Sequence, residues 1–531
     1  MLFFRTPVVL LFLLSLAVGW YACKPEDVSF PAGTAVSMAD MLEGATEIPF
    51  QVNPSGIAPL TALSSFKTRV LCKATVEVLG SEPITHDFEE YSNSFDLPIL
   101  GLFPGQINEV VLTLTTQNGA YAKDTLRIET VPLPSDFPEI TIEQFQPAAM
   151  EPGFHFAELS LGAGDRYRSM PILFDHTGTI RWWLELDAFS GLCWPVQRLQ
   201  NGNLLFARNH LWYEYNMLGQ KINDWKLQDY YIYHDIIEMP DGNFLAVSDK
   251  VGVEIVAGTG ETVPSKADHI ILVDRNTGVV LREWDIAQLL DVDRYEILST
   301  QEDWLDMNAI WYDDTDQSIV LSGRNQGMAK VSWENELIWI LAPHKGWGLS
   351  GRSGDGPPTA PFLLTAVDAA GTPYSTEVQD GVVSHPDFDW PWAQHAPEIL
   401  SNGNIFVFDN GFKRNFGAGS NYSRGVEYKI DESAGTIQQV WQFGAERGNA
   451  FYASVISDVD FLPQTGNRLI SPGIVWEGNE AYSKIVEVDP LTDALVFEAT
   501  LHFKNQGGNG TATWWNMDIS YRAGRLTPYP E

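Results

Sequence analysis

Two histidines stand at the same distance before two short turns of the sequence. His234 lies eight residues before Gly242, and His395 lies eight residues before Gly403. The chain has only ten histidines. Two histidines that converge on one place are better evidence for a catalytic site than a single histidine, which more often has a structural role. Because a neutral imidazole can act as a nucleophile or exchange a proton near neutral pH, the pair marks a candidate catalytic site.

Four more polar or aromatic residues each lie eight residues before one of four further turns. The six positions are Trp194, His234, Asn308, His395, Asp458 and Asn516. An ordinary core face would carry valine, isoleucine or leucine there, so six such side chains that converge describe a ligand pocket. A polar, water-filled channel is the alternative interpretation.

Arg324 adds a candidate cation to these positions. It follows the hairpin after Asn308, in the segment 322–326 (SGRNQ). Its planar fork donates parallel hydrogen bonds, so an arginine beside histidines suits a tetrahedral oxyanion. A surface salt bridge is an equally weighted alternative on spacing alone.

Three tryptophans, Trp194, Trp304 and Trp392, lie at or near the six positions. They would sandwich an aromatic substrate or else belong to the hydrophobic core. The sequence contains no Cys or His zinc pattern, no phosphate loop and no Gly-x-Ser-x-Gly elbow. The acidic residues at 313–316 suit calcium less well than a solvated hairpin turn. We therefore expect no metal and no cofactor.

Two repeated elements predict the fold that positions these residues. A turn followed by a strand that often ends in tryptophan occurs at 175–183, 219–225, 276–284, 335–339, 435–441 and 493–497. A strand that enters an Asn-Gly-Asn-type turn occurs at 201–203, 241–243, 314–316, 402–404, 465–467 and 523–524. Asn-Gly and Asp-Gly tolerate the positive φ of tight hairpins. Two hairpins per unit and six units predict an all-β protein with a six-bladed β-propeller, whose innermost strands begin at the central channel.

Residues 47–140 predict a smaller N-terminal β-sandwich. Alternating runs at 68–78 and 108–115 are bounded by the turns Pro104-Gly105 and Asn118-Gly119. A chain of 531 residues is long enough for two domains. We expect the sandwich at 47–140 and the propeller at 141–531.

The first 23 residues predict an export signal. Arg5 supplies the positive end, and residues 8–18 form an apolar run that is too short to cross a membrane with its flanks. Ala22 before Cys23 fits lipoprotein processing, although Trp20 and Tyr21 fit the usual small-residue pattern poorly. Lipidation at Cys23 is favoured over simple cleavage and over a retained anchor. Residues 24–46 would then be a polar tether that links the protein to a membrane, in the periplasm or on the cell surface.

The net charge of −36 restricts the partners. Such acidity argues against nucleic acid and against an anionic membrane surface. It also disfavours anionic substrates unless local cations overcome the overall field. The oligomeric state cannot be inferred from these residues.

Several ordered segments resemble one family of bacterial enzymes. They are 97–108 (LPILGLFPGQIN), 234–243 (HDIIEMPDGN), 303–304 (DW), 322–326 (SGRNQ), 338–341 (IWIL), 394–395 (QH), 408–411 (FDNG) and 422–428 (YSRGVEY). Together they are similar to the bacterial arylsulfate sulfotransferases, which are periplasmic and independent of the nucleotide sulfate donor. The resemblance covers nearly all of the chain beyond the tether.

The resemblance implies a ping-pong reaction between a small aromatic sulfate donor and a phenol acceptor. A histidine at the position of His395 takes the sulfuryl group from a phenolic sulfate and gives it to a second phenol. Arg324 and His234 would hold the sulfuryl oxygens, and His234 could also exchange a proton with a phenol oxygen. Asn308 and Asp306 would line the substrate site.

Two positions depart from the family pattern. Asp306 stands where the family usually has a histidine two residues before the asparagine, and Tyr233 stands where a second histidine can precede His234. A carboxylate repels a sulfate. Two hypotheses therefore stay open: an arylsulfate sulfotransferase with a modified site, and an exported propeller lipoprotein that binds an aromatic or glycan ligand without turnover.

Overall fold

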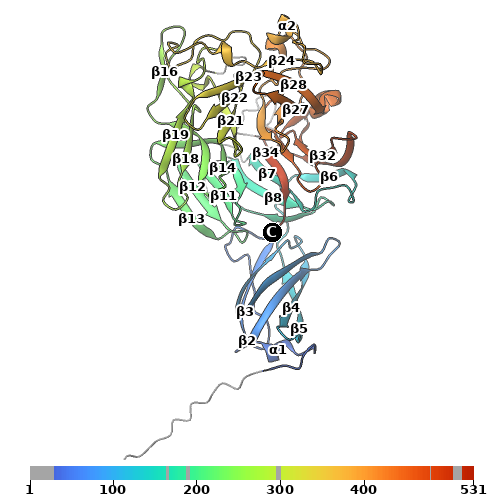
Figure 1. The fold of residues 1–531 in the computed structure, drawn as a ribbon. Helices are drawn as coiled ribbons and strands as arrows, with labels where there is room; N and C mark the ends of the chain where they lie inside the picture. The colour runs from blue at the N-terminus through green and yellow to red at the C-terminus, as the bar shows by residue number, and fades with distance from the viewer. Residues whose placement is uncertain are drawn as a thin grey trace, which may run out of the picture.

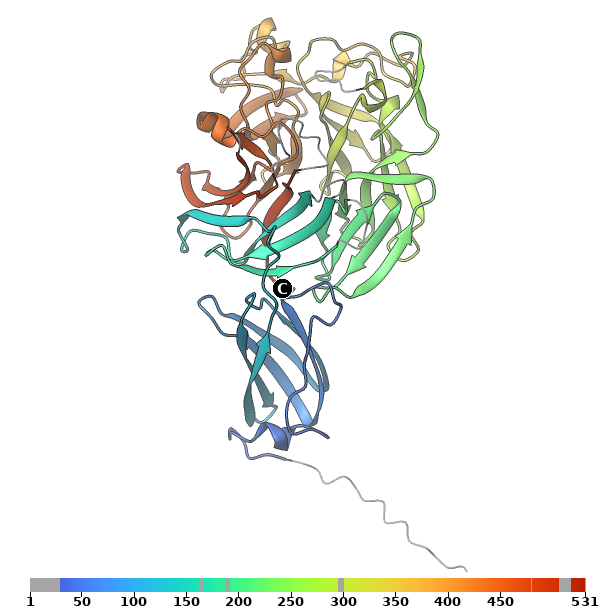
Figure 2. The same cartoon turned by 180° about the vertical axis from the view of Figure 1, so that it is seen from behind.

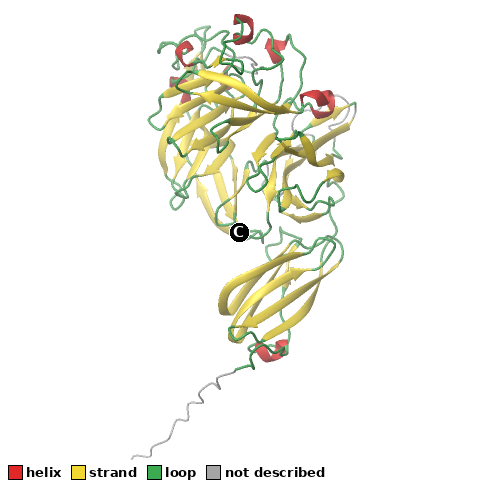
Figure 3. Ribbon diagram, turned by 45° about the vertical axis from the view of Figure 1, so that its right-hand side comes forward, coloured by secondary structure: helices red, strands yellow, loops and turns green. Residues whose placement is uncertain are grey.

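The computed structural model describes residues 29–162, 167–186, 192–294, 300–478, 480–505 and 517–530. Figure 1 shows an elongated β-domain joined to a ring of sheets, with the C-terminus at the junction. Strands are the main regular elements of both parts, loops connect them, and the short helices lie outside the sheets (Figure 3). Within the described ranges, no helix is long and apolar enough to cross a membrane.

The β-domain is a single hydrogen-bonded sheet of five strands. They are β1 (Gln51–Val52), β2 (Thr61–Val78), β3 (Ile84–Leu100), β4 (Ile107–Thr116) and β5 (Tyr121–Glu129). The order is β1–β2–β4–β5, and β3 pairs with the opposite edge of β2. Side chains along β2 and β4 alternate between buried and exposed, as a strand with one face on the core requires. The predicted all-β class of this region is confirmed, and its strands hydrogen-bond into one sheet where a sandwich was predicted.

The segment before β1 is folded onto this domain. Helix α1 (Met38–Met41) buries Met38 and Met41, and Ser37 caps it by accepting the Asp40 amide hydrogen. Isolated bridges join Ala35 to Tyr121 and Leu42 to Thr68. The prediction of a polar tether over 24–46 is therefore wrong from Ala35 onward, because buried methionines hold this part on the domain.

The segment 97–108 forms the joint between the two parts. Arg181 of the propeller donates from Nε and Nη2 to the Gly101 carbonyl, at 3.0 and 2.7 Å. Tyr529, near the C-terminus, donates its hydroxyl to the Pro98 carbonyl and accepts the Leu100 amide hydrogen, both at 3.0 Å. The Arg181 side chain has no exposed surface. Because its charge is balanced by Asp175 at 3.1 Å, the joint buries a paired cation.

The ring consists of six sheets, which we number as blades. Blade 1 contains β10 (Val196–Arg198), β11 (Leu204–Arg208), β12 (Leu211–Tyr215) and β13 (Lys221–Lys226). Blade 2 contains β14 (Tyr230–Glu238), β15 (Phe244–Lys250), β18 (His269–Val273) and β19 (Val280–Asp285). Blade 3 contains β20 (Met307–Asp313), β21 (Ser318–Gly323), β22 (Gly327–Ser332) and β23 (Leu337–Leu341).

The remaining blades carry additional strands. Blade 4 contains β25 (His395–Ile399), β26 (Ile405–Asp409), β27 (Arg424–Asp431), β28 (Thr436–Phe443) and the parallel β24 (Thr365–Ala366). Blade 5 contains β29 (Asp458–Phe461), β30 (Arg468–Ser471), β31 (Val475–Glu477), β32 (Glu480–Asp489), β33 (Ala494–His502) and β6 (Glu139–Phe145). Blade 6 contains β34 (Ile519–Leu526), β7 (Phe154–Gly162), β8 (Tyr167–Phe174) and β9 (Ile180–Trp183).

Short elements outside the blades connect them. A small hairpin of β16 (Glu254–Val256) and β17 (Thr262–Pro264) extends from blade 2. The helices are α2 (Thr376–Gln379) and the 3₁₀ turns η1 (Ile286–Gln288), η2 (Gln301–Asp303), η3 (Ala360–Phe362), η4 (Arg414–Gly417) and η5 (Ala445–Phe451).

Strands from both ends of the chain close the ring. β34 pairs with β7, from Ile519 opposite Ser160 to Leu526 opposite Phe154. On the neighbouring sheet, the N-terminal strand β6 pairs with β33. Figures 1 and 2 show the red C-terminal strand beside the cyan strands of the same ring. A closed ring of six blades confirms the predicted propeller.

The repeated turns fall where the blade pattern requires, with one exception. All six tryptophan-type elements form the outermost hairpin of a blade, and five of the six Asn-Gly-type turns join its two innermost strands. The sixth, at Ala523-Gly524, is not a turn but lies within β34. That prediction is wrong because blade 6 takes its innermost strand from the far end of the chain, so no turn connects β34 to β7.

Candidate functional site

The predicted axial residues lie on the innermost strands or directly before them. His395 opens β25 and Asp458 opens β29, while His234 and Asn308 lie within β14 and β20, which contact each other. Trp194 lies two residues before β10. Asn516 and Cys23 lie outside the described residues. Five of the six positions therefore belong to neighbouring blades around one axis.

The backbone is unusual at two of the polar residues. His234 has φ of 60° and Asp306 has φ of 50°. Histidine, aspartate and asparagine enter this left-handed region more readily than other non-glycine residues. At His234 the irregularity is a register shift between Ile232 and Ile236 in the β14–β15 pair. Such a bulge redirects a side chain from its ordinary strand direction.

Asp306 lies near two other predicted site residues, His234 and Arg324, and also contacts Tyr233. One of its carboxylate oxygens accepts a hydrogen bond from the Tyr233 hydroxyl at 3.1 Å and lies 4.0 Å from His234 Nε2. The other oxygen lies 3.6 Å from Arg324 Nη1. Asp306 thus places His234 and Arg324 on either side of one carboxylate. Burial first, and then the charge of Asp306, raises the pKa of nearby Asp303 to about 7.

His234 is held as a neutral imidazole with a defined tautomer. The Tyr521 hydroxyl donates its only hydrogen to the His234 carbonyl at 2.9 Å, and the same oxygen lies 2.8 Å from His234 Nδ1. Nδ1 must therefore carry the ring hydrogen, and Nε2 keeps its lone pair. Burial lowers the pKa of His234 to about 4, although the charge of Asp306 acts in the opposite direction.

His395 is almost completely buried and sits between hydrogen-bond acceptors. Its Nδ1 lies 2.7 Å from Asn410 Oδ1 and 3.1 Å from the Ala393 carbonyl. Burial is the main reason that its pKa lies well below the ordinary value, and the positive charge of Arg324 lowers it further. The strand β25, which His395 opens, contacts β20 and also β21, whose last residue precedes Arg324.

Arg324 differs from the other arginine at the axis. Arg522 lies 3.2 Å from Asp235 and 3.7 Å from Asp458, so two carboxylates neutralise it. Arg324 has the single 3.6 Å ion pair with Asp306, and its buried Nε has no hydrogen-bond partner among the described residues. A buried, unpaired N–H donor costs free energy unless a ligand accepts from it. Arg324 is therefore the axial cation with donor capacity for an anion.

Asn308 links the histidine strand to blade 3. Its Nδ2 donates to the Gln394 carbonyl at 2.8 Å, and Gln394 donates to the Gly323 carbonyl at 3.0 Å. These bonds tie the residue before His395 to the residue before Arg324. Asn308 Oδ1 is buried and has no partner in the described part of the chain, so it is an acceptor that a substrate hydroxyl would satisfy.

The three predicted tryptophans occupy different environments. Trp194 is half-buried, stacks on Tyr521 with ring centroids 4.3 Å apart, and lies 6.4 Å from the His234 ring. Trp304 and Trp392 have no exposed surface and pack in hydrophobic clusters. A ring without exposed surface cannot touch a ligand in this conformation. Only Trp194 is placed to contact an aromatic substrate.

Two residues that contact the histidines were not identified from the sequence, namely Asn410 and Tyr521. Asn410 stands in the segment 408–411, which had been matched only as part of a resemblance. Tyr521 comes from β34, whose position at the axis follows from ring closure. For Asn410, a polar residue directly after a buried strand was the available signal; for Tyr521 the sequence carried none.

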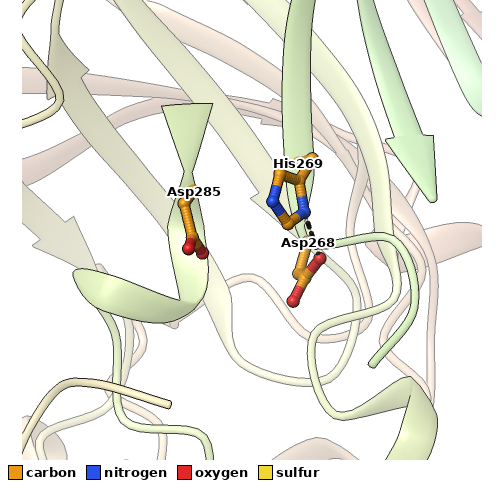
Figure 4. A group of neighbouring side chains, drawn as sticks. All are labelled: Asp268, His269 and Asp285. Atoms are coloured by element: carbon orange, nitrogen blue, oxygen red, sulfur yellow. Dashed lines mark hydrogen bonds and ion pairs between the residues drawn. The ribbon is translucent and has the colours of Figure 1, made fainter. Parts of the chain in front are cut away.

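A second polar cluster lies in blade 2, formed by Asp268, His269 and Asp285 (Figure 4). Their ligand atoms lie within 4.8 Å of one another, a spacing that suits a metal ion. Arg352 occupies this position instead, with Nη2 at 3.1 Å from Asp268 and 2.8 Å from Asp285. His269 Nδ1 lies 2.6 Å from Asp268. The guanidinium already neutralises both carboxylates, so the cluster is a buried ion-pair network.

A cavity of about 890 Å³ opens at the other end of the innermost strands. The inner hairpin turns form its rim, including the acidic turn predicted at 313–316. Asp313 accepts from the Thr315 amide and hydroxyl, at 3.1 and 2.5 Å, and Lys330 pairs with Asp313 and Asp316. These contacts are those of a capped hairpin turn.

Comparison with known proteins gives consistent matches. A family model described as "Arylsulfotransferase (ASST)" matches residues 139–510, and one described as "Arylsulfotransferase Ig-like domain" matches residues 50–131. Two relatives named "Arylsulfate sulfotransferase AssT", from Escherichia coli O6:H1 and Lelliottia amnigena, are 29% and 27% identical. Each alignment covers 84% of this chain and 89% of the relative. A solved structure titled "Structure of Dos1 propeller" aligns over 90% of this chain and 95% of that one, but at 8% identity and a TM-score of 0.29 it adds nothing to the assignment.

Proposed function

The chain belongs to the arylsulfotransferase family, and on that premise we propose that it transfers a sulfuryl group from a phenolic sulfate ester to a phenol acceptor through a sulfated His395. The family supports the aryl sulfotransferase class. One observation carries the residue assignment: hydrogen bonds tie the residue before His395 to the residue before Arg324, whose Nε is an unpaired donor, while burial keeps the His395 imidazole neutral. A neutral nucleophile beside an unsatisfied cation suits attack on an anionic sulfate ester.

In the first half-reaction, the ring nitrogen of His395 that carries a lone pair attacks the sulfur of the donor. An N–S bond forms, the S–O bond to the aryl oxygen breaks, and its electron pair leaves with the phenolate. Arg324 donates to the sulfuryl oxygens as charge shifts among them. The stack of Trp194 on Tyr521 offers an aromatic surface for the donor ring.

In the second half-reaction, the acceptor phenol attacks the sulfur while His234 removes its proton. The N–S bond breaks, and its electron pair returns to His395. Because His234 holds its hydrogen on Nδ1, its Nε2 accepts the phenol proton and has no N–H to offer a sulfuryl oxygen. We therefore assign His234 to proton exchange, and it passes the proton on to water or to the phenolate released earlier.

Incubation with a chromogenic aryl sulfate, with and without a phenol acceptor, tests the proposal. Without an acceptor we expect a burst of about one phenolate per protein molecule, as a covalent intermediate accumulates. The peptide that contains His395 should then gain the mass of one SO₃ group. Addition of the phenol should release that group as a new aryl sulfate. Turnover without any sulfated protein would contradict the ping-pong scheme.

Removal of the Asp306 charge should raise activity. Asp306→Asn keeps a side chain that tolerates positive φ and can still accept from Tyr233, but it no longer neutralises Arg324. Removal of a carboxylate near the sulfate should raise kcat/KM for an aryl sulfate on the order of tenfold. Asp306→His should raise it further, since the ring adds a donor. A matched control is Asp224→Asn, which removes an exposed carboxylate from the outer edge of blade 1. Unchanged or lower activity in both Asp306 variants would exclude Asp306 as an inhibitory charge.

Activity should persist in mildly acidic solution. The reaction needs both imidazoles neutral, and both have lowered pKa values, that of His234 lying at about 4. A lowered pKa keeps the neutral form above that value, so kcat/KM should fall only as the pH drops towards 4, rather than near the ordinary histidine value of about 6.5. Tryptophan fluorescence at each pH would show whether the protein is still folded. A midpoint near 6.5 in folded protein would refute the neutral-imidazole assignment.

The binding-protein hypothesis also has a specific observation in its favour, because Asp306 lies 3.6 Å from the Arg324 that would bind the sulfate. If no donor in a broad panel of aryl sulfates is turned over, the hypothesis of a protein that binds a ligand without turnover is favoured over the enzyme. We further propose that the protein is exported and anchored through Cys23. Labelling with a radioactive fatty acid, lost in Cys23→Ser, would test the anchor.

A further inference from the structure

Asn410 contacts the ring nitrogen of His395 that faces away from the proposed chemistry. It follows the last residue of β26, while His395 begins the neighbouring strand β25. Its Oδ1 lies 2.7 Å from His395 Nδ1. Both side chains are buried, and Asn410 has no exposed surface. No part of the mechanism above uses Asn410.

The orientation of the Asn410 amide is determined by its other contacts. Its Nδ2 donates to the Ala453 carbonyl at 2.8 Å and to the Ile456 carbonyl at 2.9 Å. These two bonds use both amide hydrogens. A rotated amide would place its oxygen against two carbonyl oxygens and lose both bonds. The Asn410 oxygen must therefore face His395.

This orientation determines where His395 carries its hydrogen. The Asn410 oxygen and the Ala393 carbonyl, 3.1 Å away, are both acceptors, so Nδ1 has to be the donor. A neutral imidazole has one N–H, which leaves the lone pair on Nε2. No hydrogen bond in the described part of the chain involves Nε2. We infer that Asn410 is a positioning residue, which fixes His395 in its Nδ1–H tautomer and leaves Nε2 unprotonated for attack on sulfur.

A buried polar network surrounds the Asn410 side chain, and Ser423 contacts the Asn410 main chain only. Ser423 donates to the Asn410 carbonyl at 2.8 Å and accepts the Ala453 amide hydrogen at 2.9 Å. Ser423 has no exposed surface. The bonds to Ala453 and Ile456 join blade 4 to the segment that leads into blade 5, whereas the bond from Ser423 to Asn410 lies within blade 4. Because a buried network with all members paired specifies one arrangement, the amide has a single orientation available.

The inference rests on the proposed function and adds a feature to it. Attack on sulfur turns the neutral His395 ring into a cation, whose remaining N–H is on Nδ1. The hydrogen bond to Asn410 then becomes charge-assisted, and such bonds are about twice as strong as neutral ones. Asn410 therefore stabilises the sulfated form more than the resting form, which should appear in kcat more than in KM.

Nitrogen NMR of the resting protein tests the tautomer without any substrate. Protein labelled with ¹⁵N-histidine shows for each ring which nitrogen is protonated, and the spectrum of His395→Gln identifies the His395 signals. We expect wild-type His395 to be protonated on Nδ1. In Asn410→Ala, the Nδ1–H population should fall and kcat should drop about 10²-fold with little change in KM, because the ring loses its orientation.

Ser423→Ala is the matched control, because it removes a bond to the Asn410 main-chain carbonyl but leaves the Asn410 amide bonded to the Ala453 and Ile456 carbonyls and to His395. It should retain the Nδ1–H signal and most of kcat. The inference is wrong if wild-type His395 is protonated on Nε2, if Asn410→Ala keeps both the tautomer and kcat, or if Ser423→Ala matches Asn410→Ala in both. A wild type without turnover would count against the proposed function, while the tautomer alone would still decide the role of Asn410.

Discussion

Replacement of His395 by alanine should abolish sulfuryl transfer. The axial site has two imidazoles, and His234 is committed through Nδ1 to Tyr521 and faces Asp306 with Nε2. A sulfate ester near that carboxylate would be repelled, so His234 cannot take over as nucleophile. Loss of a nucleophile commonly lowers kcat by about 10⁴-fold or more. Phenolate release should therefore fall to background, and no sulfated peptide should form.

Two further variants show whether the loss of activity is specific to the nucleophilic nitrogen of His395. His385→Ala removes a histidine that is 39% exposed in the segment between blades 3 and 4, and it should leave the rate unchanged. His395→Gln keeps a polar side chain of similar length but has no nucleophilic nitrogen, and it should be as inactive as His395→Ala. A folded His395→Ala protein with the wild-type rate would show that the nucleophile is another residue.

Replacement of Arg324 should cause the next largest loss. Its unpaired Nε and its forked guanidinium are the donors available to the sulfuryl oxygens, since Arg522 is neutralised by Asp235 and Asp458. Removal of one oxyanion donor typically costs about 10²–10³-fold in kcat. Arg324→Gln should lose activity to this extent. Arg324→Lys should lose less, because it keeps the charge without the bidentate geometry.

The measurement is kcat and KM on one aryl sulfate for both variants. Arg127→Gln is a suitable control, because Arg127 is 66% exposed in the β-domain and makes only a 3.4 Å surface ion pair. A loss confined to KM would assign Arg324 to donor binding rather than to the transition state. Equal activity of Arg324→Gln and wild type would remove Arg324 from the mechanism.

The sequence predicted the propeller because its turns are local. The six outer hairpins and five inner turns depend on residues such as Gly202 and Gly403, whose φ values are 80° and 82°. The signal of each turn lies within a few residues. The sixth inner turn failed because the innermost strand of blade 6 pairs across the whole chain, and no local pattern reveals such a pairing. The buried methionines of α1 were missed for a related reason, since their partners are in β2 and β5.

The site was predictable in position but not in its contacts. Counting from the turns identified His234 and His395 because both lie on innermost strands. The tautomer of each ring depends on Tyr521 and Asn410, which come from other strands. Trp304 and Trp392 were predicted at the site together with Trp194, because the sequence does not distinguish a buried tryptophan from one that faces the axis.

Because β34 is separated from its partner strand by most of the propeller sequence, ring closure affects the timing of folding. The partner β7 is synthesised about 360 residues earlier, as the register of Ile519 with Ser160 shows. Until β34 has been synthesised, the edge of β7 that it will cover stays unpaired, and an open strand edge can pair with another chain. Contacts so distant in sequence also make folding slow. The ring therefore closes only once β34 has been synthesised, and until then the polypeptide depends on whatever keeps nascent chains apart.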